Sequence, residues 1–351
     1  MIYKSLLKYD GLAGQCLVAC TADGQSAQLL LRPYSKSDTE LLPGQGTAAV
    51  VRSVAHDQGG YFLEAASGQP LFLSITDSRD LLEGQRCEVV CVASARFGKS
   101  ARVRIAPEGK DLTSSAVSAW IAQLFGESIP EPHDDSESHL QIDQFIDELS
   151  ANSVTLQNGG RITIEQTRAL TAVDVDTVGR ADRTGSRAER AHRINLDATA
   201  ELARQIALRD LGGTIVLDCL SPISKARGKA LQTVFLAAFK ALSNRRVRAL
   251  RPSDFGLIEI AVAWGMAPFH DRFLDEFGRP NGHLQLWQAL RQLESEAMIR
   301  TGDQLVLELT SDTIALFDAK RSDYMQRIQS RFGGRIEVEP SRTGKTEVRS
   351  I

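Results

Sequence analysis

Short apolar or alternating runs, separated by glycine, aspartate and serine, fill the first hundred residues of the chain. Runs of this kind are QCLVACT, AQLLLR, GTAAVVRSVA, GYFLEAA, PLFLSI, RCEVVCVAS and ARVRIA. Many short strands at this spacing predict a small barrel or a sandwich. The pattern changes over residues 106–145, where GESIPEPHDDSESH is acidic, contains proline and serine, and has few apolar residues. We interpret this part as a linker or mobile loop.

From about residue 150 the pattern indicates alternating strands and helices. SVTLQNGGRITIEQT predicts a hairpin that turns at residues 158–160, and RALTAVDV predicts the next strand. In NLDATAELARQIALRDLGG the apolar residues recur at helical spacing, with Asn195 as the expected N-cap and Gly212 as the expected stop. The continuous apolar run TIVLDCL is typical of a buried parallel strand.

The rest of the chain continues in the same way. We expect a helix over about 224–243, a strand at FGLIEIAVA, a helix over 285–300, and a helix, a Gly-Gly turn and a strand in DYMQRIQSRFGGRIEVEP. There is no internal repeat. A length of 351 residues and an apolar content of 42% suit two or three domains. The sequence therefore predicts an α+β multidomain fold.

Composition narrows the class of protein. The formal net charge is −3, so a nucleic-acid partner has to be sought in local charge. The first residues carry charges and no apolar stretch of the signal-peptide kind. No apolar run reaches the roughly 18–20 residues that cross a bilayer. We therefore expect a cytoplasmic protein with no membrane partner.

Five cysteines, an odd number, do not suggest a disulfide framework. Two pairs share a C-x-x-x-C spacing, Cys16 with Cys20 and Cys87 with Cys91, and a zinc site made from both pairs is conceivable. Each pair lies in an apolar run typical of a strand, where a free cysteine behaves as a small apolar residue. Structural zinc sites also favour tighter turns between ligands. We expect no zinc.

Two aspartates stand near the ends of two predicted strands. A helix of suitable length joins the strand of Asp174 to that of Asp218, so these strands should pair in parallel. Ligands bind at the carboxyl edge of open α/β sheets, and two carboxylates there repel each other unless they share a proton or a cation. Mg²⁺ suits the pair because it takes one or two carboxylates together with water and phosphate oxygens. An aspartate at a strand end can also form a turn or cap a helix, a role that suits Asp176.

Basic residues flank the aspartates in two clusters. The first comprises Arg180, Arg183, Arg187, Arg190 and Arg193. The second, within residues 225–251, includes no acidic residue and comprises Lys225, Arg227, Lys229, Lys240, Arg245, Arg246, Arg248 and Arg251. A positive zone beside a carboxylate pair suits a polyanion whose phosphate approaches a metal ion. The alternative is a solvated helix face, the usual role of a run of charge.

The β-rich half contributes aromatic residues beside cations. Phe62 and Phe72 lie in adjacent predicted strands, and Arg96 and Lys99 lie nearby in ARFGKSARVR. Aromatics that stack on bases, beside cations for the backbone, are how OB-folds hold single-stranded nucleic acid. Phenylalanines in strands are more often part of a core.

Several of these segments resemble the ribonuclease E/G family. INLDATAELARQIALRDLGGTIVLDCL, IEQTRALTAVDVDTVGR and FGLIEI are similar to long stretches of that family, and AKRSDYMQRIQSRFGGRIEVEP is similar to its small terminal domain. GQGTAAVVRSVAHDQGGYFLEAASGQPLFLSITD resembles, more faintly, its OB-fold RNA-binding domain. The resemblance implies five parts: a β-rich remnant of an RNase H-like domain (1–40), an OB-fold (41–107), a linker and short helix (108–148), a DNase I-like catalytic domain (149–270) and a small C-terminal domain (284–351).

The resemblance also implies a catalytic centre. Asp174 and Asp218 match the two aspartates that bind Mg²⁺, with Mn²⁺ as an alternative. Asp176 stands where the family has an asparagine that helps to hold the catalytic water or the substrate. Val178 is an extra residue in the turn that follows, and Asp254 stands where the family has an arginine.

RNA contacts follow by position in the same way. Phe62, Phe72 and Lys99 fall at single-strand-binding positions. Arg246, or Arg245 given a one-residue alignment ambiguity, matches an RNA-contacting arginine near the metal, and Arg180 of the first basic cluster is a further candidate contact. No cysteine follows Cys219, so the zinc link of the family is absent, and the chain has no room for its domain that senses a 5′-monophosphate. We therefore expect cleavage that does not depend on the state of the 5′ end, and a monomer or weak homodimer.

The leading hypothesis is a Mg²⁺-dependent endoribonuclease that cleaves single-stranded RNA to 3′-hydroxyl and 5′-phosphate ends, in RNA processing or decay, for example ribosomal RNA maturation. The altered turn at Asp176 and Val178 keeps open a second hypothesis, a non-catalytic RNA-binding protein that assists RNA maturation. A third, an α/β metabolic enzyme acting on a small phosphate ester, does not explain the OB-like half.

Overall fold

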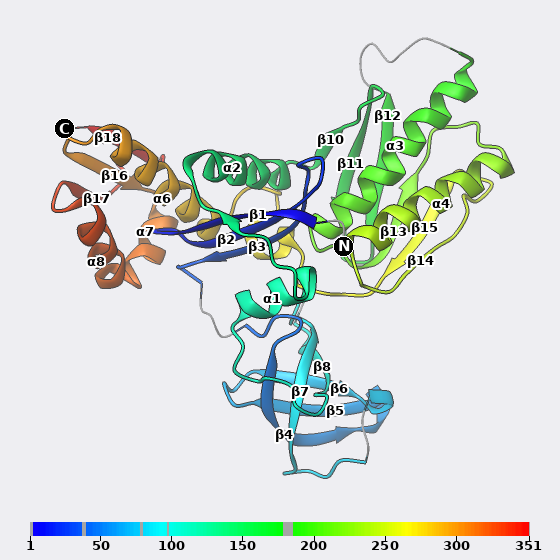
Figure 1. The fold of residues 1–351 in the computed structure, drawn as a ribbon, viewed down its shortest axis with the longest axis horizontal. Helices are drawn as coiled ribbons and strands as arrows, with labels where there is room; N and C mark the ends of the chain where they lie inside the picture. Colours follow the sequence, from blue (N-terminus) through cyan, green and yellow to red (C-terminus); the bar gives the residue numbers. More distant parts are fainter. Residues whose placement is uncertain (1–2, 37–39, 78–79, 97, 178–184, 351) are drawn as a thin grey trace.

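The computed structural model describes residues 3–36, 40–77, 80–96, 98–177 and 185–350. Within these ranges the strands form a four-stranded sheet, a six-stranded sheet, a three-stranded sheet and a closed five-stranded barrel. The six-stranded and three-stranded sheets lie at opposite ends of the molecule, with the four-stranded sheet between them and the barrel below (Figure 1). The α+β multidomain fold predicted from the sequence is confirmed.

The barrel accounts for the short runs of the β-rich half. Its strands are β4 (Gly46–Ala55), β5 (Gly60–Ala65), β6 (Pro70–Ser74), β7 (Arg86–Ala93) and β8 (Ala101–Ile105), in the order β4-β5-β6-β8-β7. All neighbours are antiparallel except β6 and β8, which are parallel. Alternate residues of each strand fill the interior of the barrel, and the residues between them face outward. The alternation of apolar and polar residues in the sequence therefore corresponds to the inner and outer faces of the barrel.

The first strands of the chain form a separate sheet. It comprises β1 (Tyr3–Gly11), β2 (Gly14–Thr21), β3 (Ser26–Pro33) and the short β9 (Pro132–His133), in the order β3-β2-β1-β9. The segment interpreted as a linker or mobile loop contains β9 and two helices, α1 (Ala116–Phe125) and α2 (Ser136–Ser150). Over these two helices the interpretation as a loop was wrong, because Asp135 caps α2 and the helix buries Ile142, Ile146 and Leu149 against this sheet. Only one face of α2 is apolar, so the average composition of the segment is polar and resembles that of a loop.

The six-stranded sheet carries the aspartates. Its strands are β10 (Ser153–Thr155), β11 (Gly160–Gln166), β12 (Thr171–Thr177), β13 (Gly213–Asp218), β14 (Val247–Ala249) and β15 (Leu257–Val262), in the order β10-β11-β12-β13-β15-β14. The predicted hairpin is present as β10 and β11. Helices α3 (Arg187–Leu208) and α4 (Lys225–Leu242) lie side by side against one face, where the core forms (Figure 1). The other face carries exposed residues.

Helix α3 begins earlier than the sequence suggested. Ser186 is its N-cap, and Ser186 and Glu189 form a reciprocal capping box. Asn195, the expected N-cap, is therefore buried in the middle of the helix, and the correction places part of the first basic cluster on the first turns of α3. The helix ends at Leu208, shortly before Gly212, because Asp210 adopts a left-handed conformation with φ of 56°.

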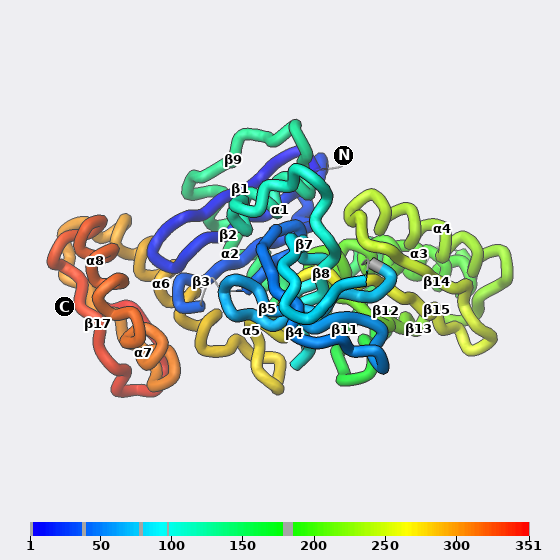
Figure 2. Tube along the Cα trace, turned by 90° about the horizontal axis from the view of Figure 1, so that it is seen from below, coloured from blue at the N-terminus to red at the C-terminus, as the bar shows by residue number. Residues whose placement is uncertain are grey.

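The C-terminal part packs against the first strands of the chain. It contains α5 (Phe269–Phe273), α6 (Gly282–Ile299), β16 (Leu305–Leu309), α7 (Ser311–Asp318), α8 (Arg321–Phe332), β17 (Ile336–Pro340) and β18 (Glu347–Ser350). Apolar residues of α6, α8 and β16 form one buried cluster with residues of β1–β3. Tyr9 of β1 donates a hydrogen bond to the buried carboxylate of Glu294 in α6. Figure 2 shows the C-terminal elements beside the N-terminal sheet, far from α3 and α4.

Among the described residues, no helix combines the length and the apolar character that a membrane span needs.

Candidate functional site

Asp174 and Asp218 lie side by side on neighbouring strands. The two residues are register partners in the parallel pair of β12 and β13, as expected from the sequence. Asp218 is the last residue of β13, and β12 continues for three residues beyond Asp174. Val173 and Leu217, their neighbours, are buried under the helices, so the two carboxylates project from the opposite, exposed face. The topology thus presents two acids together to solvent.

The electrostatics of this face favour a cation. Burial raises the pKa of Asp174, and the negative charges of Asp176 and Asp218 raise it further. A negative charge on Asp174 is therefore unfavourable here unless a positive charge is added. Within the described ranges, no group of three or more histidine, cysteine, aspartate or glutamate residues is placed to hold a metal ion. Two carboxylates with open access to water and phosphate form a donor set that fits Mg²⁺.

Asp176 has a basic partner that the sequence did not indicate. It lies two residues after Asp174, on the same exposed face, and its register partner on β11 is Arg161. A guanidinium nitrogen of Arg161 lies 3.4 Å from the Asp176 carboxylate. Both side chains are about half exposed, so the pair contributes little to stability. Its effect is to offset part of the negative charge beside Asp174.

Asn195 fixes the chain just after Asp218. Its side-chain amide donates a hydrogen bond of 2.9 Å to the Leu220 carbonyl and accepts one of 2.9 Å from the Leu220 N–H. Asn195 is 1% exposed and Leu220 is half-buried, so water has limited access to both bonds. The residue predicted to cap α3 therefore has another role. Its two hydrogen bonds hold the segment after β13, and with it Asp218, against the helix.

Replacing Asn195 with alanine should destabilise the protein. The change leaves the N–H and carbonyl of Leu220, a half-buried residue, without their partners, and each such loss costs about 1–3 kcal/mol. We expect a lower urea midpoint, equivalent to about 2–4 kcal/mol. Asn244, which is exposed at the end of α4, provides the control, because its replacement with alanine should leave the midpoint unchanged. Equal midpoints for the two variants would contradict the proposed contribution of the Asn195 hydrogen bonds to stability.

Phe62 and Phe72 form an aromatic pair on the outside of the barrel. They are register partners on β5 and β6, with ring centroids 5.5 Å apart in an edge-to-face arrangement. Both are only partly buried, whereas their neighbours Tyr61 and Leu73 lie in the barrel core. The exposed Arg102 of β8 is the register partner of Phe72 and lies beside the pair. Sequence reasoning missed Arg102, although its alternation with the buried Ala101 and Val103 places it outside.

The turn before β8 connects the barrel to the six-stranded sheet. Lys99 is exposed in this turn, where it forms a β-bridge with Arg96. The Arg96 guanidinium lies over the ring of Trp264, 4.2 Å from its centroid. The Ser94 N–H donates a 2.9 Å hydrogen bond to the carbonyl of Gly265. Trp264 and Gly265 follow β15, so the barrel is attached where that strand ends.

Two neighbouring arginines have different roles. The Arg245 guanidinium donates hydrogen bonds to the carbonyls of Ile206 and Leu211, so it holds the end of α3 and the start of β13 together. Arg246 is exposed and is the candidate for an RNA contact. Arg180 and Val178 lie outside the described residues. The exposed members of the second basic cluster are Lys225, Lys229, Lys240, Arg246, Arg248 and Arg251.

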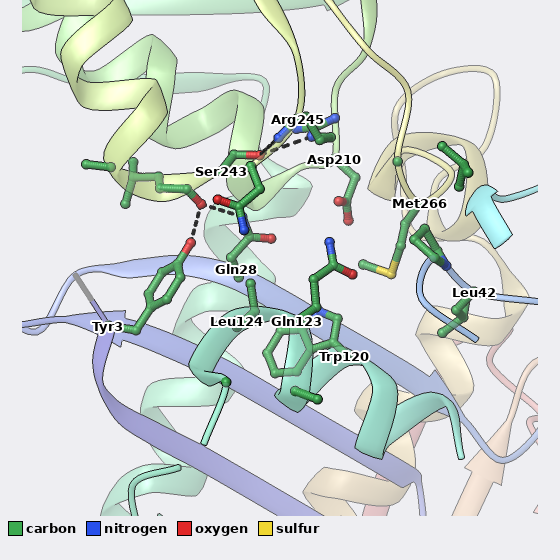
Figure 3. Close-up of a pocket in the computed structure, with 18 residues that line it drawn as sticks. Tyr3, Gln28, Leu42, Trp120, Gln123, Leu124, Asp210, Ser243, Arg245 and Met266 are labelled. Carbon is green, nitrogen blue, oxygen red and sulfur yellow. Dashed lines mark hydrogen bonds between the residues drawn. The ribbon is translucent and has the colours of Figure 1, made fainter. Parts of the chain in front are cut away.

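A cavity of about 320 Å³ lies away from the paired aspartates, between the N-terminal sheet, α1 and the end of α4. Figure 3 shows Asp210, Gln28, Gln123 and Trp120 around it. Burial raises the pKa of Asp210 to about 6, although the charges of Arg245 and Arg272 oppose this. Of the residues proposed from the sequence, only Arg245 lines this cavity.

The two cysteine pairs lie in different sheets, Cys16 and Cys20 in β2 and Cys87 and Cys91 in β7. Burial raises the pKa of the Cys20 thiol to about 11 and that of Cys91 to about 12. The thiolate form that binds zinc is therefore disfavoured at these positions. The two pairs do not come together into one four-cysteine site.

Residues 113–263 match the sequence model of the ribonuclease E/G family. This range includes α1, α2 and the whole six-stranded sheet, with both aspartates. The first strands, the whole barrel and the C-terminal elements lie outside it.

Known proteins show the same similarity. Ribonuclease E of Escherichia coli (strain K12) is 38% identical over 124 residues, which are 35% of this chain and 12% of that protein. Ribonuclease E of Buchnera aphidicola subsp. Acyrthosiphon pisum is 27% identical over 231 residues, 61% of this chain and 24% of that protein. A chloroplastic ribonuclease E/G-like protein of Arabidopsis thaliana is 34% identical over 123 residues, 34% of this chain and 12% of that protein. The matches thus span a quarter or less of each of these relatives.

Proposed function

We propose that this chain, which belongs to the ribonuclease E/G family through residues 113–263, is a Mg²⁺-dependent endoribonuclease that cleaves single-stranded RNA. The observation that carries the proposal is the register pairing of Asp174 with Asp218 on the exposed face of a sheet within the matched region. The names of the relatives, all ribonucleases, support the reaction class.

The two aspartates would hold the Mg²⁺ ion, which supplies Lewis-acid activation of a water molecule and of the phosphate oxygens. The residues of the chain would do the rest. Arg161 keeps part of the charge of Asp176 balanced, so that the Asp176 carboxylate can orient a water molecule or the substrate beside the ion. Asn195 holds the end of β13, which keeps the carboxylate of Asp218 beside that of Asp174.

The barrel would hold the strand. Its order β4-β5-β6-β8-β7, with one parallel pair, supports an OB-fold. Phe62 and Phe72 offer rings on which bases can stack, and Arg102 and Lys99 offer positive charge for the backbone. Arg246 is the candidate phosphate contact next to the sheet.

We include further points in the proposal. The catalytic domain is DNase I-like, and the products carry 3′-hydroxyl and 5′-phosphate ends. The protein acts in RNA processing, for example in ribosomal RNA maturation. It is cytoplasmic and is a monomer or weak homodimer without zinc.

A non-catalytic RNA-binding protein is the second candidate. Asp176 favours it, because this carboxylate adds negative charge beside the aspartate pair and engages Arg161. Such a protein would bind RNA through the barrel and leave it intact.

Incubation of end-labelled single-stranded RNA with the protein separates the two candidates. The endoribonuclease should produce internal cuts with Mg²⁺ or Mn²⁺ and none with chelator, and the new 5′ ends should be sensitive to phosphatase. RNA that is bound and remains intact with either metal would refute the nuclease and favour the second candidate.

A further inference from the structure

Phe255 is a large apolar side chain held in water. It is 87% exposed, more than any other large hydrophobic residue of the described ranges. The turn that carries it is well defined, because the Ser253 N–H bonds to the Leu257 carbonyl and the Gly256 N–H bonds to the Ser253 carbonyl, both at 2.9 Å. Gly256 adopts φ of +87°, which favours glycine. An aromatic ring presented in this way has no role in the core of this chain.

The turn is attached to the end of the strand that carries Asp218. The Cys219 N–H, one residue after Asp218, donates a 3.3 Å hydrogen bond to the Gly256 carbonyl. Leu257 is the register partner of Asp218. Phe255 thus lies two residues from that partner, beyond the carboxyl end of β13.

The barrel is attached at the opposite end of the same pair of strands. Gly213, the first residue of β13, is the register partner of Val262, and Trp264 and Gly265 follow after one intervening residue. These last two residues contact the barrel through Arg96 and Ser94. Along β13 and β15, Asp218 therefore lies between the barrel attachment and Phe255.

Positive charge lies beside the turn that carries Phe255. A hollow of about 460 Å³ beside the turn is lined by Lys225 and Arg251, together with Asp254 and Gly256. Lys225 and Arg251 are exposed, so they are accessible to a phosphate group. An exposed aromatic residue with cations beside it is the combination that single-stranded nucleic-acid sites use, because every base has a face that can stack.

We infer that Phe255 is a stacking platform for a base on the side of the scissile phosphate away from the barrel, with Lys225 and Arg251 beside the phosphate of that nucleotide. The inference rests on the proposed function, in which single-stranded RNA crosses the aspartate pair. The strand is then held on both sides of the cut, by Phe62 and Phe72 of the barrel and by Phe255 beyond the acids.

The test compares F255A and F255W with F277A. Phe277 is 72% exposed in a turn between α5 and α6, so F277A is a matched control that removes an exposed ring elsewhere. The affinity for single-stranded RNA is measured with chelator, and kcat/KM is measured with Mg²⁺. F255A should weaken the affinity and lower kcat/KM by about tenfold, the effect of losing one base–aromatic stack. F255W should retain both values and show quenching of tryptophan fluorescence on RNA binding beyond that of the wild type, and F277A should behave as the wild type.

A second measurement locates the contact. The effect of F255A should disappear on substrates shortened on the side of the cut that the barrel does not hold, and it should persist on substrates shortened on the other side. An affinity and a kcat/KM of F255A equal to those of the wild type would overturn the inference. A second result would also overturn the inference. If the wild type sediments as a dimer and F255A as a monomer, with the same RNA affinity, the ring contacts a second copy of the chain and not a base. Failure of the proposed function would give a different result. If the wild type binds RNA without cutting it, the nuclease proposal fails, but the RNA affinity of F255A still tests the stacking platform.

Discussion

Replacement of Asp218 with asparagine is expected to lower kcat/KM for RNA cleavage by about 10³-fold, which corresponds to about 4 kcal/mol of transition-state stabilisation. Asparagine has nearly the same shape but no charge, so the variant should keep the packing of β13 and lose the charge of one of the two proposed ligands for Mg²⁺. The same loss is expected for Asp174→Asn, because the two carboxylates are register partners. The measurement is the rate of internal cleavage of single-stranded RNA at saturating Mg²⁺.

The protein offers a control on the same sheet. Glu259 of β15 is exposed and is the register partner of Val216, so it projects from the aspartate face without pairing with either acid. Glu259→Gln should therefore retain activity close to that of the wild type. Equal losses in Glu259→Gln and Asp218→Asn would mean that the charge of the face matters and that the aspartate pair does not hold a metal ion.

The same substitutions should not unfold the protein. Without divalent metal, Asp174 and Asp218 repel each other, and like charges directly opposite on neighbouring strands destabilise a sheet, by about 0.2–1 kcal/mol. Asp174→Asn should therefore unfold at the same or a slightly higher urea concentration than the wild type. Added Mg²⁺ should stabilise the wild type and have little effect on the variant, which gives a metal-binding measurement independent of cleavage.

Replacement of Asp210 with asparagine should stabilise the protein at neutral pH and have almost no effect near pH 4. Burial raises the pKa of this carboxyl from 3.8 to about 6. Between these values the unfolded chain loses its proton and the folded protein keeps it, so the stability of the wild type falls as the pH rises, and above about pH 6 the loss is complete. A shift of about two pKa units corresponds to about 3 kcal/mol at most. Asparagine resembles the protonated form and tolerates the left-handed conformation of this position.

Urea denaturation from pH 4 to pH 8 measures this effect as the difference in midpoint between Asp210→Asn and the wild type. That difference should be near zero at pH 4, grow up to about pH 6 and then remain constant. Asp254→Asn, which alters an exposed carboxyl, is measured over the same pH range as the control. A stabilisation that is independent of pH would indicate that packing, and not ionisation, is responsible.

Local patterns in the sequence predicted the elements whose apolar residues are continuous or strictly alternating. The strands of Asp174 and Asp218 could be predicted because apolar residues recur in each over several positions. The predicted helix between the two strands implied that they pair in parallel. Phe62 and Phe72 were predicted in adjacent strands, but the sequence analysis did not place their rings outside the barrel, where the register of β5 and β6 sets them opposite each other. Alternation with the buried Tyr61 and Leu73 contained this signal.

Elements stabilised by contacts between distant segments were missed. Helix α2 is acidic on its exposed side, and the spacing of Ile142, Ile146 and Leu149 was its only signal in the sequence. Asn195 resembles a helix cap because capping residues are short and polar, but here its partner is Leu220, twenty-five residues away. The pairing of Arg161 with Asp176 depends on the register of β11 and β12, which sequence periodicity does not determine.

The buried cluster shared by β1–β3 and the C-terminal elements has a consequence for synthesis of the chain. The partners of Tyr9 and Tyr34 include Glu294 and Asp323, nearly three hundred residues later. The part of the apolar surface of β1–β3 that α6, α8 and β16 cover therefore stays open until these C-terminal elements have been synthesised. A premature stop after residue 263, even with the aspartate sheet intact, would leave that surface open to aggregation and to chaperones.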